Sequence, residues 1–218
     1  DSLVAMVIAG VAEQDANRAI DLALDLSSPI ERDRAIQFVA MSAARDDATA
    51  EALANRLLAL EGSQPNSSIG FNIASMWVSR SPDRAMGWLL ANGQNASPNV
   101  FFQVGQQLAM RDPRNAIAYT TQVPAAARES WARGIGQGYA RRDPEAAIEW
   151  LGQFRGEDWY ARTAVTAAME AAQMNPAPAA RLVDGLDAGR GAAETQRLTN
   201  VIATSWASRE PTAAAAWA

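Results

Sequence analysis

The chain has 218 residues, of which 49% are hydrophobic, and a formal net charge of −5. This composition excludes a disordered chain, and the negative charge argues against electrostatic binding of nucleic acid or anionic lipid. The sequence lacks cysteine, histidine and lysine, so it cannot build a thiolate nucleophile, an imidazole base, a zinc–thiolate cluster or a Schiff base. We therefore predict no metal, no cofactor and no enzymatic activity. No apolar run approaches the ~18 residues that span a membrane.

The first predicted elements are two helices at the start of the chain. The apolar opening, Asp1 to Gly10, reads as the second helix of an earlier repeat rather than a signal peptide, because it lacks a basic start. Asp15 then marks a helix start, and Ser28-Pro29-Ile30-Glu31 has the pattern of a capping box with proline at the first helical position. Turn-forming residues are predicted to join helices at 61–66, 92–95 and 185–191.

Five prolines then recur along the chain at spacings of 31, 31, 32 and 35 residues: Pro82, Pro113, Pro144, Pro176 and Pro211. Ala16 and Asp47 stand at the same position in two earlier copies, so the sequence contains seven copies of one unit. In six of the seven copies the preceding residue is of a type that caps helices, and proline suits the first helical position. We name the predicted helix that begins at the proline position helix A, and the one that precedes it helix B.

Small and large side chains alternate along each predicted helix A. Alanine stands three residues after the proline position in every copy, at Ala19, Ala50, Ala85, Ala116, Ala147, Ala179 and Ala214. Six residues after that position lies a bulky residue, such as Trp88, Trp150 or Trp217. The small residue allows close approach of a neighbouring helix, and the large one fills the space beside it. These seven alanines are therefore predicted to be buried.

A hairpin of two helices and ~31 residues cannot bury its apolar face alone, so neighbouring hairpins must stack. The predicted fold is all-α, a right-handed α-solenoid of about seven hairpins with no strand. We expect a single domain over 1–218, with units starting near 15, 46, 81, 112, 143, 175 and 210. The final run Ala213 to Ala218 stops part-way through a predicted helix, so we expect the chain to be a piece of a longer protein.

Gly136 and Tyr139, followed by Asp143, Ala147 and Ile148, resemble the core of the tetratricopeptide repeat. The resemblance extends loosely over all seven copies, and HEAT-type and Sel1-like repeats are comparable. The period is nearer 31 than 34 residues, and a proline stands in the tight turn. The resemblance implies a scaffold that binds a protein or peptide, with no catalytic residue.

Phe154, Arg155, Trp159 and Tyr160 form the candidate contact patch, because Trp159 and Tyr160 match no aromatic position in the other copies. A loop that folds back onto its own hairpin is the alternative explanation. The other six tryptophans are predicted to fill the core, because their positions also hold leucine, tyrosine or valine. Arg45, Arg80, Arg111, Arg142 and Arg209 precede the turn, where a structural role at helix C-termini is expected. Two carboxylate pairs, Glu145 with Glu149 and Glu157 with Asp158, lie close enough in the sequence for acid–base chemistry, but we expect them to be solvated.

Two functions remain open at this point. The first is a non-catalytic scaffold in which the superhelix binds a protein or peptide. The second is the accessory superhelix of a larger bacterial cell-envelope enzyme acting on glycans. The use of arginine without lysine is the reason to expect a bacterial source. The sequence does not determine the compartment, whether periplasm, envelope or cytoplasm, nor the oligomeric state.

Overall fold

The computed structural model describes residues 2–61, 69–184 and 192–217, and these residues are helical with connecting turns and no strand. They divide into two compact units, residues 1–100 and 101–218, and the boundary falls within one helix. We describe each unit by itself. The turns predicted at 62–66 and 185–191 lie outside the described residues.

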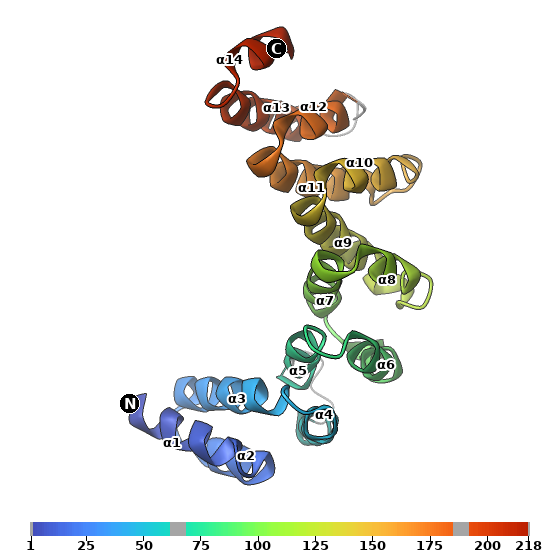
Figure 1. Ribbon diagram of the computed structural model, residues 1–218. Helices are drawn as coiled ribbons and strands as arrows, with labels where there is room; N and C mark the ends of the chain where they lie inside the picture. Colours follow the sequence, from blue (N-terminus) through green and yellow to red (C-terminus); the bar gives the residue numbers. More distant parts are fainter. Residues whose placement is uncertain (1, 62–68, 185–191, 218) are drawn as a thin grey trace. The chain divides into compact units, whose positions relative to one another are not determined.

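Unit 1 contains six complete α-helices and the start of a seventh among its described residues (Figure 1). Their bounds are α1 Ser2–Ala12, α2 Ala16–Leu24, α3 Pro29–Ala43, α4 Asp47–Glu61, α5 Ile69–Trp77, α6 Pro82–Asn92 and α7 Pro98–Arg111. The short 3₁₀ helix η1, Gly93–Asn95, follows α6.

Unit 2 contains the rest of α7 and seven further helices in the part of the chain that the structure describes (Figure 1). Their bounds are α8 Pro113–Ala118, α9 Arg128–Arg142, α10 Pro144–Gly152, α11 Tyr160–Met174, α12 Pro176–Asp184, α13 Ala192–Ala207 and α14 Pro211–Trp217. The 3₁₀ helix η2, Ala125–Ala127, leads into α9.

All seven A helices, the even-numbered α2 to α14, begin at the predicted proline position. Four aspartates cap them as the sequence predicts: Asp15, Asp46, Asp112 and Asp143 accept a hydrogen bond from the backbone N–H three residues later, at 2.8–3.1 Å. Ser81 makes no such side-chain bond. The proline spacing therefore predicts where each A helix starts. The side-chain hydrogen bond of the cap residue is present in these four copies and absent at Ser81.

The seven repeated alanines are buried, with exposed fractions of 0–4%. In six copies the alanine N–H also donates to the carbonyl of the cap residue, for example Ala147 to Asp143 at 3.0 Å. This bond closes the first turn of the helix, so the alanine is held at the start of helix A with its methyl group against neighbouring helices. The prediction of their burial is confirmed.

Helices pack in the same order within each unit. Helices from α1 to α6 in unit 1 and from α8 to α14 in unit 2 contact the next one along the chain. B helices contact the following B helix, as in α1–α3 and α3–α5 of unit 1 or α9–α11 and α11–α13 of unit 2. A helices do the same in α2–α4, α4–α6 and α10–α12. Contacts to the nearest and next-nearest helices are what stacked hairpins produce.

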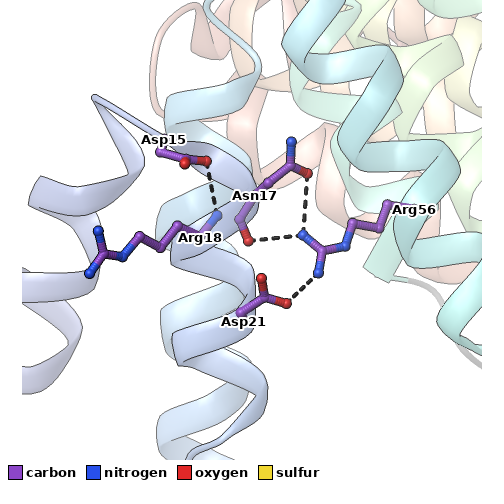
Figure 2. A network of polar contacts seen from close by, with 5 residues as sticks. All are labelled: Asp15, Asn17, Arg18, Asp21 and Arg56. Carbon is purple, nitrogen blue, oxygen red and sulfur yellow. Dashed lines mark hydrogen bonds and ion pairs between the residues drawn. The ribbon is translucent and has the colours of Figure 1, made fainter.

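Polar side chains reinforce contacts between consecutive copies. In Figure 2, Arg56 of α4 reaches α2, where it donates to the Asn17 carbonyl at 2.9 Å and pairs with Asp21. The same view shows Asp15 capping the Arg18 N–H. Because Arg56 and Asp21 are both at the surface, their ion pair contributes little stability, and its main effect is on the register of α4 against α2.

Glycine allows unusually close packing in unit 2. A Cβ added at Gly134 or Gly138 of α9 would overlap the backbone of α7, at the Phe102 and Gln106 carbonyls. On another face of α9, a Cβ at Gly136 would lie 2.9 Å from Thr163 Cγ2 of α11. The glycines at 134, 136 and 138 therefore serve helix packing on both sides of α9.

Candidate binding site

A series of four aromatic rings runs from the end of α9 to the start of α11. Tyr139 of α9 lies 6.4 Å from Trp150 of α10, measured between ring centroids, and Trp150 lies 5.4 Å from Phe154. Phe154 in turn lies 5.1 Å from Trp159, which immediately precedes α11. The rings are tilted or edge-on to one another, which is the favourable geometry for aromatic pairs.

The first pair of this series is part of the repeat, and the rest is not. Trp206 and Trp217 in the last copy occupy the positions of Tyr139 and Trp150, and their centroids lie 5.9 Å apart. Phe154 and Trp159 extend the series because the segment after α10 turns back, with the Phe154 N–H donating to the Leu151 carbonyl at 2.9 Å. The aromatic residues of the turn thus pack on their own hairpin.

The four predicted contact residues differ in exposure, and two of them, Phe154 and Trp159, are in ring contact. Phe154 and Trp159 are half-buried, and Arg155 is exposed. Tyr160 is only 5% exposed, so it is part of the core. The surface that a partner could touch consists of Phe154, Arg155 and Trp159, which we call the ring surface.

Tyr160 and Thr163 lie one turn apart at the start of α11, and both are buried. Thr163 stands at the repeat position held by Val100, Trp131 and Leu198, and it is fully buried. A threonine fills much less space than a tryptophan, and the buried Tyr160 lies one turn before it on α11. The hydroxyl groups of both residues are buried and have no hydrogen-bond partner, so the start of α11 belongs to the core.

The indole N–H groups of the repeated tryptophans follow a rule that the sequence analysis missed. Trp88 donates to Asn55 Oδ1 at 2.8 Å, and Trp217 donates to Asp184 Oδ1 at 3.3 Å. In both cases the acceptor lies on the preceding A helix, eight residues after its proline position. The equivalent acceptor position for Trp150 is Thr121.

Trp150 lacks the acceptor that its counterparts have. The residue is only 7% exposed, and its indole nitrogen is buried without a hydrogen-bond partner. The reason lies in α8, which ends at Ala118, so that Thr121 falls in the following turn. The pair Thr120-Thr121 and the proline at 124 disfavour continuation of a helix. A buried, unpaired N–H carries a free-energy cost of about 1–3 kcal/mol.

Charged groups surround the first ring of the series. Burial raises the pKa of the Tyr139 hydroxyl, and the negative charges of Asp143 and Glu149 add to this effect, against the arginines at 114 and 142. The hydroxyl therefore stays protonated at neutral pH and remains a hydrogen-bond donor. Nothing in this arrangement resembles a general base.

The arginines before the turn act between copies. Arg142 donates to the carbonyls of Met110 and Arg111 at the end of the preceding B helix, and Arg209 donates to the Met174 carbonyl at 3.0 Å. Arg45 lies 3.7 Å from Glu13 of the preceding copy. Arg142 and Arg209 therefore satisfy terminal carbonyls of a helix in the preceding copy, whereas Arg45 pairs with a carboxylate there. The expected structural role at helix ends is thus exerted on the neighbouring copy.

The remaining tryptophans behave mainly as core residues. Trp77 and Trp131 are fully buried, and Trp88 is 6% exposed, whereas Trp206 and Trp217 are half-buried in the last copy. The Trp77 indole donates to Asp47 at 2.7 Å and the Trp131 indole to Thr120 at 3.3 Å. Their positions in the repeat therefore carry packing and inter-helix bonds.

The carboxylates singled out for acid–base chemistry do not form a pair in a cleft. Glu145 is exposed and pairs with Arg181 of the next A helix, while Glu149, Glu157 and Asp158 are exposed. Within the described ranges, no group of three or more acidic side chains is placed to hold a metal ion. None of the described helices is long and apolar enough to cross a membrane.

Comparison with known proteins identifies no relative. No protein-family model matches the chain, and no curated protein and no solved structure matches it either.

Proposed function

We propose that the protein is a non-catalytic scaffold that binds a protein or peptide segment, with the ring surface of Phe154, Arg155 and Trp159 as a contact site. The observation that carries this proposal is the departure from the repeat after α10. There the aromatic pair common to other copies is extended by two half-buried rings and an exposed arginine. Aromatic and arginine side chains dominate the binding energy of most protein interfaces.

The architecture supports the same proposal. Helices that contact their nearest and next-nearest neighbours are consistent with a tetratricopeptide-like, right-handed solenoid, in which the fold presents a long surface and individual side chains provide specificity. We further propose that the seven copies form one such superhelix and that the protein is bacterial. The missing histidine, cysteine and lysine side chains favour binding over catalysis.

The test is a selection of peptides on the purified protein. Random peptides displayed on phage are panned against the immobilised wild-type chain, and the affinities of selected sequences are measured by calorimetry for the wild type and an Arg155→Ala/Trp159→Ala variant. We expect the variant to lose at least about tenfold in affinity. Trp206→Ala, which removes another half-buried tryptophan in unit 2, is the matched control and should bind normally.

Two results would contradict the proposal. If the selected peptides bind the double variant as tightly as the wild type, the ring surface does not contribute to peptide binding. A selection that enriches no binding peptide would remove peptide binding itself.

Half-exposed rings at Phe154 and Trp159 also fit a sugar ring, which keeps the accessory domain of a glycan-acting envelope enzyme as a second candidate. Titration with soluble peptidoglycan fragments separates the two. Tryptophan fluorescence that responds to the glycan and not to selected peptides would favour this second function.

A further inference from the structure

Two features of α10 and one of the preceding copy together describe a ligand more narrowly than the proposed function does. The first is the ring series Trp150, Phe154 and Trp159. The second is the unpaired indole N–H of Trp150, and the third is the early end of α8, which removes its acceptor. Other copies with a tryptophan at this position have the acceptor on the protein, as Trp88 and Trp217 show.

We propose that this place binds a proline-rich peptide segment in the extended polyproline II conformation, an inference that rests on the peptide-binding function proposed above. The pyrrolidine rings pack on Phe154 and Trp159, and one peptide carbonyl oxygen becomes the acceptor that Trp150 lacks. The end of α8 is where that oxygen substitutes for the side chain at position 121.

The chemistry of the two partners is complementary. A polyproline II segment has no internal hydrogen bonds, and proline has no N–H, so such a segment presents apolar rings and carbonyl acceptors only. The site presents aromatic rings and, in the indole, a group that can only donate. A glycan, in contrast, brings hydroxyl groups that need both donors and acceptors around the rings.

The spacing of the rings is compatible with such a segment. The centroid distances along the series are 5.4 Å from Trp150 to Phe154 and 5.1 Å from Phe154 to Trp159. One turn of polyproline II contains three residues and rises about 9 Å. Successive residues of such a segment lie about 3 Å apart along its axis, so each step of the ring series spans between one and two residues.

The Trp150 nitrogen is covered in the free protein, so peptide binding must move the side chains around it. The turn at 119–124 is the segment that stands where other A helices continue. Because the buried N–H gains a partner only when the peptide is present, the movement is favoured by binding and not by the free state.

The experiment uses a blocked oligoproline peptide of about eight residues, or somewhat under three turns of polyproline II, with a glycine–serine peptide of equal length as control. Indole Nε1–H signals of the wild-type protein are assigned by NMR and followed during titration. We expect the Trp150 signal to move downfield with oligoproline, the Trp88 signal to stay, and neither to respond to the control peptide.

Matched variants give a second readout. Trp150→Phe should weaken oligoproline binding about five- to tenfold, the effect of one hydrogen bond. Trp88→Phe makes the same change where the N–H already has a partner, and it should leave the affinity unchanged. If Trp150→Phe does not fold, the indole signals of the wild type decide the question alone.

The inference is overturned if oligoproline binds while the Trp150 signal stays in place, or if Trp150→Phe binds it as tightly as the wild type. It is also overturned if oligoproline does not bind but peptides from the phage selection do, with a loss on Arg155→Ala/Trp159→Ala. In that case the proposed peptide-binding function stands. Absence of binding by both kinds of peptide would reject the function as well.

Discussion

Trp88 in unit 1 and Trp150 in unit 2 occupy the same position of the repeat, yet only one of them has a partner for its indole N–H. The difference lies in the preceding A helix: α4 continues past Asn55, whereas α8 stops three residues before the equivalent Thr121. Whether a buried N–H group has an acceptor in this repeat protein thus depends on the length of a helix in the preceding copy. A tryptophan that is part of the core in one unit becomes a candidate binding group in the other.

A second contrast between the units concerns glycine. Gly87 in α6 of unit 1 has nothing within 4 Å of the place where a Cβ would lie, whereas Gly138 in α9 of unit 2 lies against the backbone of α7. We expect Gly138→Ala to destabilise the protein by about 3 kcal/mol, because a methyl group there forces two helix backbones apart. Gly87→Ala should stabilise it by about 0.5–1 kcal/mol through helix propensity.

Denaturant midpoints of the two variants measure this contrast. Shifts of the same sign would contradict the close backbone contact of Gly138 in α9 with α7.

The repeated alanines should be equally sensitive to a larger side chain in both units. Ala147→Leu in unit 2 and Ala50→Leu in unit 1 should each cost about 1–3 kcal/mol by overpacking, since both residues are fully buried. The exposed Ala52 provides a control on α4, where the same change to leucine should have an effect within about 0.5 kcal/mol. Unchanged melting temperatures for the two buried sites would show that these positions do not form the contact between helices.

Glu170 provides a pH test that applies to unit 2. Its carboxylate accepts hydrogen bonds from Arg141 at 2.7 and 3.0 Å and one from Gln137, and these bonds, that of Arg141 above all, lower its pKa below the ordinary 4.5. The stabilisation is therefore fully present above pH 4.5 and is lost as the pH falls through the lower pKa of the folded state.

Glu170→Gln should cost about 2 kcal/mol at neutral pH. The difference in melting temperature from the wild type should narrow as the pH falls below 4.5. Glu51→Gln, at an exposed site in unit 1, should show neither effect. A difference that stays constant from neutral to acidic pH would contradict the assigned role of the carboxylate.

The smallest expected effect concerns the two tryptophans at positions 88 and 150. Trp88→Phe and Trp150→Phe remove the same atoms, but only the first breaks a hydrogen bond and leaves Asn55 without its donor. We expect Trp88→Phe to be more destabilising by about 1 kcal/mol. Equal losses in chemical denaturation would mean that the Trp150 N–H has a partner in solution.

Sequence reasoning located the repeat because its signals are local. A cap residue, a proline and an alanine within five positions determine where a helix A starts, and the seven starts and the seven buried alanines agree with that pattern. The burial of Tyr160 was not predicted, because the side of a helix that faces the core depends on how the neighbouring helices pack.

The sequence of this protein determined its helical class, the starts of its A helices and the absence of thiol, imidazole and amine chemistry. Local propensity and side-chain identity carry that information without any partner. Only the tertiary structure decided which arginines reach carbonyls of a preceding copy and that the Trp150 indole has no acceptor. These properties depend on groups some thirty residues apart in the chain, and their distances are set by how one helix packs on the next.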